Sequence, residues 1–292
     1  MKAGISIELL RPPLIRQAYY ITGSMADAED IVHDAYVQWS NMDAQHIENP
    51  EAYLRRIVIN LAINLKERAK RQRDAYFGQW LPEPVSDSSD RTTVGKDNLS
   101  YSLLVLLESL SAKERAVFIL KEAFGYEHRE IAQVLNITEA GSRKLLSRAK
   151  ARLAADKRRP VPIAQQQAFL DRFLQAIWSG DASLVETLLR EDVTVISDGG
   201  GKAAAGKHPV AGRRSVSKML VGLYRKFYRN ALAEPGIING QPAILYWKDG
   251  MLQTCQIFDI DATGVRNVYL VRNPDKLKRL AATISLPVSR IP

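Results

Sequence analysis

The chain has 292 residues, of which 46% are hydrophobic and 25% charged, and this composition excludes a chain that is disordered throughout. It has no uninterrupted apolar run of about 18 residues, so we expect no membrane-spanning helix. The single cysteine, Cys255, cannot form an internal disulfide. The four histidines are scattered, without cysteines at zinc-ligand spacing. We therefore expect a cytoplasmic protein of two or three domains that holds no metal and no other cofactor.

The net charge of +9 is distributed unevenly, and its distribution indicates more than its sum. Seven acidic residues and no Lys or Arg lie between Asp27 and Glu51. The sign reverses between Arg55 and Arg73, where seven basic residues accompany only Glu67. A second basic run extends from Arg143 to Arg159. This alternation predicts two partners, one basic and one polyanionic.

Apolar residues at helical spacing predict helices over 25–40 and from Pro50 to about residue 73. The second of these helices is expected to bury one apolar face, formed by Leu54, Ile57, Val58, Leu61 and Leu65. Another face would carry Arg55, Lys66, Lys70 and Arg73, alongside Ile59. Residues 76–98 contain two prolines, two glycines and a Ser/Asp/Thr run, which is typical of a linker.

Helices are expected to resume near Leu99 and to end in a helix-turn-helix. A capping box at Ser111 and Glu114 predicts a helix that reaches Phe124 and stops at Gly125. A short helix over 127–135, a turn at 136–138 capped by Thr138, and a helix over 139–153 follow. The last helix separates an inward set, Ser142, Leu145, Leu146, Ala149 and Leu153, from an outward set, Arg143, Lys144, Ser147, Arg148, Lys150 and Arg152. Such a face can read the major groove, and the alternative is a helical bundle with a basic solvent face.

The composition changes after Ala154, and residues 157–162 resemble a second linker. Helices are expected over 163–179 and 182–190, followed by strands over 193–197, 243–247, 251–260 and 265–272. Lys248, Asp249 and Gly250 predict a hairpin between two of these strands. The second half is therefore expected to be an α+β domain.

The segments SMADAEDIVHDAYVQW and NPEAYLRRIVINLAINLKERAKRQR resemble region 2 of the extracytoplasmic-function (ECF) sigma factors. The segment LSAKERAVFILKEAFGYEHREIAQVLNITEAGSRKLLSRAKARL resembles their region 4. Three further motifs resemble the subgroup with a fused SnoaL-like domain: WLPEP from Trp80, DGGGK from Asp198 and NPDKL from Asn273. The resemblance implies a multidomain fold, with two all-α sigma modules followed by an α+β cone-shaped domain.

The resemblance also implies a domain organisation. Region 2 would occupy residues 1–75, a linker 76–99, region 4 100–156 and the SnoaL-like domain 163–292. Such a protein is not an enzyme; it directs RNA polymerase core to promoters and is modulated by its own C-terminal domain.

The family's functional positions map onto residues of this sequence. Binding to the clamp helices of the largest polymerase subunit is expected from Asp27, Glu29, Asp30 and Gln38. Contacts to the −10 element are expected from Arg55, Arg56, Asn60, Asn64, Lys66 and Lys70. The loop from Asn41 to Asn49 is the expected pocket for a flipped base. Trp39 or Tyr53 would stack on that base, or both would pack in the core, which is the favoured alternative. Contacts to the −35 element are expected from Arg143, Lys144, Ser147, Arg148 and Lys150. Regulatory roles are expected for Trp80, Leu81, Pro82, Asp198, Lys202, Asn273, Pro274 and Asp275.

One alternative is a helix-turn-helix regulator fused to a small-molecule-binding or cyclase- or isomerase-like domain, in which Asp198 would be a general base. The sequence offers no clear second catalytic group for it. Residues 201–208 nearly match a phosphate-binding loop but place His208 where that loop needs Ser or Thr. The sequence leaves open whether a small molecule binds in the C-terminal domain, and we expect no contact with a membrane.

Overall fold

A computed structural model of the chain describes residues 7–42, 47, 49–72, 76, 78–87, 99–153 and 161–284. The chain divides into two compact units. The first unit is Met1–Asp74, Arg91–Leu99 and Leu103–Asp156. The second is Ala75–Asp90, Ser100–Ser102 and Lys157–Pro292, so the WLPEP segment packs with the C-terminal residues.

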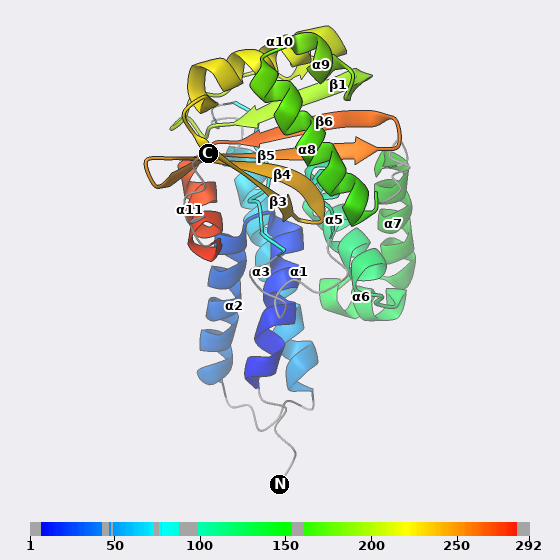
Figure 1. The fold of residues 1–292 in the computed structure, drawn as a ribbon. Coiled ribbons are helices and arrows are strands. Elements are labelled where there is room, and N and C mark those ends of the chain that lie inside the picture. The colour runs from blue at the N-terminus through cyan, green and yellow to red at the C-terminus, as the bar shows by residue number, and fades with distance from the viewer. Residues whose placement is uncertain are drawn as a thin grey trace. The chain divides into compact units, whose positions relative to one another are not determined.

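The first unit begins with a 3₁₀ turn, η1 (Ile7–Leu10), and three packed helices (Figure 1). These are α1 (Arg11–Thr22), α2 (Met25–Ser40) and α3 (Pro50–Gln72). Gly23, with φ of 80°, ends α1, and the Ser24 hydroxyl caps α2 by accepting from the Asp27 amide. The three helices bury an apolar core that includes Leu14, Ala18, Ile21, Ile31, Val32, Leu54, Val58, Ile59, Ala62 and Ile63.

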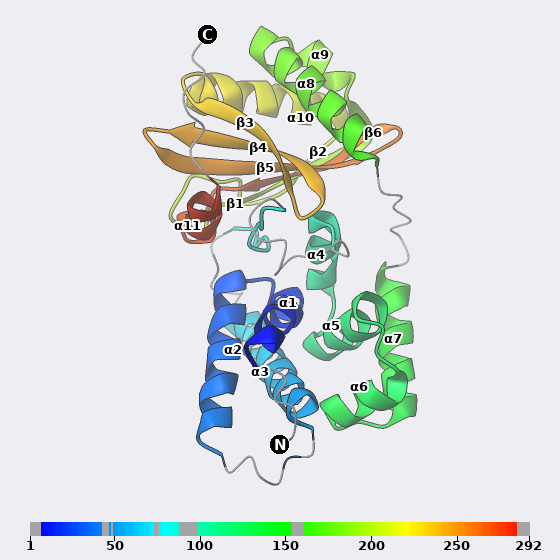
Figure 2. The ribbon, with the colours of Figure 1, turned by 60° about the horizontal axis from the view of Figure 1, so that its bottom comes forward.

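Further helices follow in the order visible in Figure 2, and the first of them, α4, starts in the second unit and continues into the first at Leu103. They are α4 (Tyr101–Leu106), η4 (Leu107–Ser109), α5 (Ala112–Phe118) with its π-helical continuation η5 (Ile119–Ala123), α6 (His128–Leu135) and α7 (Glu139–Leu153). The Ser111–Glu114 capping box is present, and Gly125 adopts a φ of 69° after η5. Helices α5 and α6 both pack on α7, so the predicted helix-turn-helix is confirmed.

The second unit is built on a mixed sheet whose described strands run in the order β2-β1-β6-β5-β4-β3. The strands are β1 (Leu189–Asp198), β2 (Val210–Ala211), β3 (Leu232–Ile238), β4 (Gln241–Lys248), β5 (Met251–Asp261) and β6 (Gly264–Val271). Strands β1 and β6 are parallel, and the other pairs are antiparallel. The predicted hairpin joins β4 to β5, with Asp249 and Gly250 at φ of 52° and 74°.

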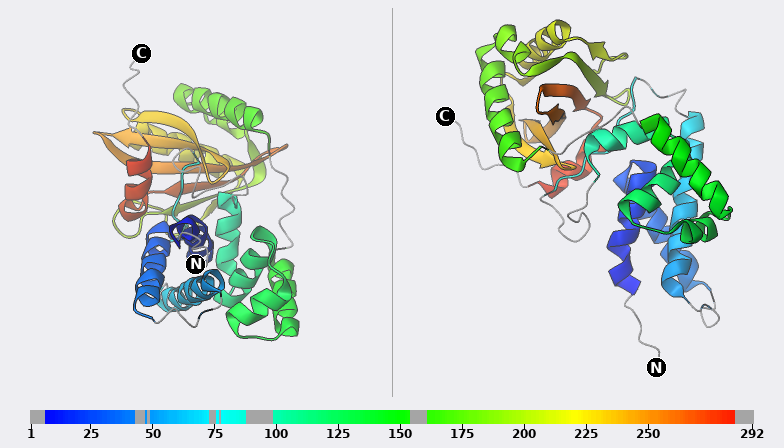
Figure 3. Two further views of the ribbon diagram at one scale, coloured as in Figure 1. Left: turned by 90° about the horizontal axis from the view of Figure 1, so that it is seen from below. Right: turned by 90° about the vertical axis from the view of Figure 1, so that its right-hand side faces the viewer.

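Helices cover both faces of this sheet (Figures 1 and 3). On one face lie α8 (Ile163–Ser179), α9 (Ala182–Glu186) and α10 (Arg213–Leu223) with its π-helical continuation η6 (Tyr224–Tyr228). On the other lies α11 (Pro274–Thr283), which packs on β5. The predicted helix over 182–190 is too long, because the chain turns after Glu186 and enters β1 at Leu189.

Aromatic side chains fill the space between the sheet and the three helices on its first face. Phe258 of β5 lies 5.1 Å from Phe169 and 4.6 Å from Phe173, between ring centroids. Tyr228 stacks on Tyr246 at 4.1 Å. Burial and the neighbouring Tyr228 and Tyr224 hydroxyls raise the pKa of Tyr246, so this phenol stays neutral. These five rings belong to one buried hydrophobic core, which fills the interior of the cone-shaped domain.

Candidate functional site

Helix α7 exposes the face that the sequence predicts for DNA. All six outward residues are exposed, whereas Ser142, Leu146 and Ala149 are buried. Thr138 caps the helix by accepting from the Gly141 amide at 3.0 Å. The unpaired donors on this face are Lys144 and Ser147, whose side chains have no partner among the described residues.

Several cations of α7 are engaged with carboxylates of the same unit. Arg143 lies 3.3 Å from Glu139 on its own helix, and Lys150 lies 2.8 Å from Glu122. Arg152 donates to the buried Glu114 at 2.9 Å, and Arg148 lies 3.9 Å from the same carboxylate. Because Glu114 also closes the capping box of α5, Arg152 fixes the C-terminal end of α7 against α5.

A second contact sets the angle between the two helices of the motif. The Ser142 hydroxyl is fully buried and lies 2.8 Å from Nδ1 of His128, the first residue of α6. Sequence reasoning assigned Ser142 to the inward face but gave His128 no role. The sequence signal that could have identified this contact is the serine at an inward position of the second helix, which needs a polar partner such as a histidine on the first helix.

The predicted −10 face of α3 is only partly exposed. Arg56 and Asn64 are exposed, whereas Asn60 donates to the Val134 carbonyl at 3.3 Å. Arg55 pairs with Glu51 and lies over the Tyr126 ring at 5.5 Å. The side chain of Lys70 and the whole of Arg73 lie outside the described residues.

The prediction that Lys66 lies on this exposed face is wrong for this structure. Its side chain is 7% exposed, and its ammonium donates at 2.8 Å to Glu108 and to the Thr22 carbonyl. Arg115 pairs with the same Glu108. The buried stripe of α3 continues from Ile59 through Ala62 and Ile63 to Lys66, at helical spacing, and carries the lysine inward.

Helix α2 presents the predicted acidic surface. Asp30 and Gln38 are exposed, together with Asp34, whereas Asp27 and Glu29 are half-buried. The rings of Trp39 and Tyr53 lie 5.9 Å apart, and both are half-buried. Of the predicted base pocket, residues 43–46 and 48 lie outside the described residues.

In the second unit, the three sequence motifs meet at one buried carboxylate. Asp198, at the end of β1, is 0% exposed. Its Oδ1 accepts from the Tyr76 hydroxyl at 2.6 Å and from the Gly200 amide at 3.0 Å. Its Oδ2 accepts from the Leu81 amide at 2.9 Å and from the Lys276 ammonium at 2.6 Å. Asp198 is therefore surrounded by four donors and is not presented to a substrate as a general base.

The rest of the WLPEP segment is held by main-chain and side-chain contacts. Leu81 is fully buried, and its carbonyl accepts from Lys276, whose ammonium lies 4.1 Å from the Trp80 ring centroid. The Val85 amide donates to Asn239 Oδ1 at 2.9 Å, and Ser86 pairs with Ile238 at the end of edge strand β3. The carbonyl of buried Pro82 accepts from the Tyr101 hydroxyl at 2.7 Å.

The DGGGK and NPDKL motifs are joined to each other as well as to the linker. Lys202 forms an exposed ion pair with Asp275 at 2.5 Å. The side chain of Asn273 caps α11 and donates to the Tyr76 hydroxyl at 3.1 Å. A Cβ on Gly200, whose φ is 59°, would come within 2.3 Å of Asn273 Nδ2, so this approach requires glycine. Pro274 is exposed and starts the helix.

Like Tyr76, Lys276 is a residue of this site that sequence reasoning missed. It contacts Asp198, Leu81, Trp80 and Tyr76, yet within NPDKL it has the pattern of an ordinary helix lysine. Burial, together with the Asp198 carboxylate, raises the pKa of Tyr76, so this hydroxyl remains a donor.

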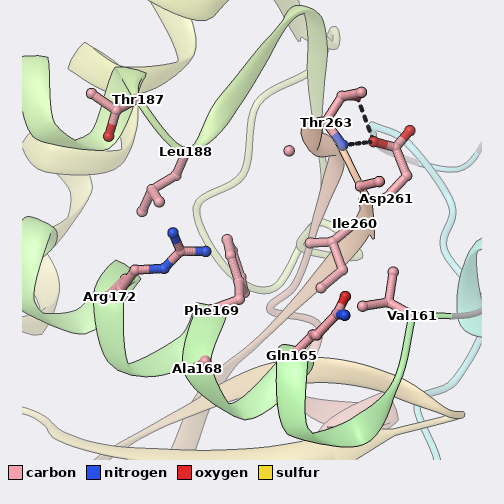
Figure 4. Close-up of a pocket in the computed structure, with 12 residues that line it drawn as sticks. Val161, Gln165, Ala168, Phe169, Arg172, Thr187, Leu188, Ile260, Asp261 and Thr263 are labelled. Carbon is pink, nitrogen blue, oxygen red and sulfur yellow. Dashed lines mark hydrogen bonds between the residues drawn. The ribbon is translucent and has the colours of Figure 1, made fainter.

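A cavity of about 390 Å³ lies between α8 and the turn that joins β5 to β6 (Figure 4). Phe169, Leu188 and Ile260 contribute apolar lining, and Gln165 and Arg172 are its polar groups on α8. Although burial opposes ionisation, hydrogen bonds from Thr263 and Arg190 hold the pKa of the lining residue Asp261 below its usual value. Asp261 and Thr263 are the polar groups on the opposite side of the cavity, and the two side chains are hydrogen-bonded to each other.

The described residues contain no group of three or more His, Cys, Asp or Glu placed to hold a metal ion. No helix in this part of the chain is long and apolar enough to cross a membrane.

Comparison with known proteins identifies both helical modules. Residues 7–72 match the family model Sigma-70 region 2, and residues 100–153 match Sigma-70, region 4. The ECF RNA polymerase sigma factor SigJ of Mycobacterium tuberculosis is 34% identical over 249 residues, covering 80% of this chain and 78% of SigJ. The probable ECF RNA polymerase sigma factor SigI of the same organism is 26% identical over 287 residues, 94% of each chain.

The similarity extends to the fold of both units. The crystal structure of Mycobacterium tuberculosis SigJ matches with a TM-score of 0.76 at 30% identity and covers 93% of this chain and 97% of that one. Regions 2 and 4 imply RNA polymerase and promoter DNA as partners. The chain therefore belongs to the extracytoplasmic-function sigma factors with a fused C-terminal SnoaL-like domain, a family that directs RNA polymerase to promoters and is not a family of enzymes.

Proposed function

We propose that α2 docks on the clamp helices of the largest polymerase subunit through Asp27, Glu29, Asp30 and Gln38. The supporting observation is an acidic helix, free of Lys and Arg from Met25 to Ser40, with Asp30 and Gln38 exposed. Opposite charges at such an interface mainly accelerate association and select the partner. In this account the protein acts in the cytoplasm, where its polymerase is.

Region 2 opens the −10 element with Arg56 and Asn64, and region 4 reads the −35 element with α7. The exposed face of α7 carries this assignment, since Lys144 and Ser147 have no competing partner among the described residues. Arg143 is available once its exposed pair with Glu139 is exchanged for a base or a phosphate. Arg148 and Arg152 instead position the helix through Glu114.

The C-terminal domain modulates the sigma modules by holding the segment that joins them. In sequence, the WLPEP segment lies between region 2 and region 4, and Asp198, Lys276 and Asn239 bind its backbone. Burial of Leu81 alone contributes about 1.5–3 kcal/mol, enough to change the ratio of docked to released segment by tenfold or more. A docked segment limits how far regions 2 and 4 can separate, and a released one does not.

The polymerase-binding part is tested by pull-down with core polymerase. Substituting Asp30→Lys and Gln38→Lys should reduce complex formation, whereas the exposed pair Lys248→Glu and Lys278→Glu should not. If full-length protein forms no complex with core, the proposed binding surface is wrong.

The regulatory part is tested by promoter activity of truncated chains at matched protein levels. A chain that ends at Pro160 loses the support of the domain and should transcribe less. A chain that ends before Asn273 loses Lys276 and the cap of α11, and should transcribe more. Equal activity of both truncations and the full-length chain would show that the domain does not regulate transcription.

A further inference from the structure

A strongly one-sided charge distribution lies in the sequence of the C-terminal domain. From Gly199 to Ala233 there are eight Lys and Arg residues and no Asp or Glu. They are Lys202, Lys207, Arg213, Arg214, Lys218, Arg225, Lys226 and Arg229. Solvated protein surfaces usually carry positive and negative charges side by side. A stretch with basic residues alone is therefore suited to a partner of negative charge.

The fold gathers four of these eight charges on the exposed side of one continuous helix and its C-terminal cap residue, Arg229. Helix α10 and its continuation η6 bury Val216, Leu220, Val221 and Tyr228. Arg214, Lys218, Arg225 and Arg229 are exposed, at intervals of four, seven and four residues, which keeps them on one side. Figure 1 shows α10 on the face of the sheet opposite α11, which belongs to the linker site.

These four exposed residues, Arg214, Lys218, Arg225 and Arg229, form a basic stripe. Within the described residues, the charges of this stripe are largely uncompensated. Arg213, at its edge, pairs with Glu191 at 2.7 Å. Arg225 donates to the carbonyl of Gly180 at 2.9 Å, which leaves its charge in place. No described carboxylate pairs with Arg214, Lys218 or Arg229. A row of unpaired cations on a rigid helix is suited to a regular polyanion.

We propose that the outer face of α10 and η6, formed by Arg214, Lys218, Arg225 and Arg229, binds the phosphate backbone of duplex DNA. The side chains are donors only, and Arg and Lys bind phosphates without reading base sequence. This surface adds sequence-independent affinity to the base reading by α7. Because it belongs to the C-terminal domain, it gives that domain its own contact with DNA.

The test measures binding of the full-length protein to a duplex of about 30 base pairs without promoter sequence, over a series of salt concentrations. The variant Arg214→Gln/Lys218→Gln removes two charges from the stripe. The matched control Lys248→Gln/Lys278→Gln removes two exposed charges elsewhere in the same unit. All proteins are first compared by circular dichroism and thermal unfolding.

Each lost phosphate contact should reduce the magnitude of the slope of log affinity against log salt by about 0.9. The stripe variant loses two charges, so the magnitude of its slope should fall by about 1.8. The control should keep the wild-type slope. Equal slopes and affinities in both variants would overturn the proposal and leave a merely solvated face. A stripe variant that binds DNA normally but loses core polymerase would also overturn it, in favour of an acidic protein partner. Neither result depends on the linker segment, so the proposed regulation is tested separately.

Discussion

The ammonium of Lys276 lies 2.6 Å from Oδ2 of Asp198, with side-chain exposures of 12% and 0%. The pair joins α11 to the end of β1, and both partners also bind the main chain of Leu81. Breaking a buried ion pair by removing one partner costs about 3–5 kcal/mol, because the other charge stays buried. The pair therefore couples the C-terminal helix to the segment between regions 2 and 4.

Replacing Lys276 by Met should release this segment. Asp198 would keep three donors but lose its only charged partner among the described residues, and Leu81 would lose the donor to its carbonyl. Hydrogen exchange at the amides of Leu81 and Val85 should accelerate by at least tenfold. Lys278→Met, on the same helix but exposed, is the control. Unchanged protection in Lys276→Met would show that the pair does not hold the segment.

Docking of the segment should weaken as the pH rises through the titration of Asp87. One oxygen of Asp87 accepts from Gly240, and the other is buried without a partner among the described residues. Burial raises the pKa of Asp87 above 3.8, despite the opposing hydrogen bonds from Gly240 and Asn239. A carboxyl pKa raised in the docked state favours docking at low pH, and this contribution is lost as pH rises through the raised value. Asp87→Asn should therefore protect the Val85 amide more than wild type does at neutral pH. The difference should disappear as the pH falls well below the ordinary value of 3.8, and a constant difference at all pH values would contradict the assignment.

Arg143→Ala and Lys144→Ala should each weaken promoter binding without changing thermal stability. A base contact is worth about 1–3 kcal/mol and would relax specificity at one −35 position. A phosphate contact would weaken binding to all promoters alike. Fluorescence anisotropy with promoter duplexes that differ at single −35 positions distinguishes these cases. Unchanged affinity and salt dependence in the double variant would remove this face from DNA recognition.

Lys66→Met should destabilise the first unit rather than act only on DNA binding. Glu108 would keep Arg115 but lose Lys66, and the Thr22 carbonyl would lose its donor. Since Glu108 is only partly buried, we expect a loss of about 1–3 kcal/mol, measured by chemical denaturation. Arg56→Met, exposed on the same helix, should leave stability unchanged. If Lys66→Met keeps wild-type stability, the buried contacts of Lys66 are not important to the fold.

The local structure could be predicted wherever a cap or an apolar period was present. The helices over Met25–Ser40, Glu139–Leu153 and Ile163–Ser179 have the predicted bounds. Strand β3 was not predicted because it contains Pro235 and Gly236, which usually interrupt strands. Helix α10 was not predicted because Pro209 and Gly212 precede it, yet Gly212 ends up as its N-cap.

The long-range arrangement could be predicted only in part. The three motifs indicated a regulatory function, but Asp198 and Lys276 are 78 residues apart and Tyr76 and Asp198 are 122 apart. No local pattern specifies contacts at such separations. Lys66 was misplaced for a related reason, since tertiary packing decides whether a lysine beside an apolar stripe is buried or exposed.

Run-off transcription with purified core polymerase tests whether the protein directs initiation at promoters. Core alone and core with the full-length protein are compared on pooled genomic fragments, with Lys144→Ala as the region 4 variant. We expect transcripts from a small set of shared start sites with the protein, and weaker transcripts from the same sites with the variant. The absence of any start site that depends on the protein would contradict this expectation.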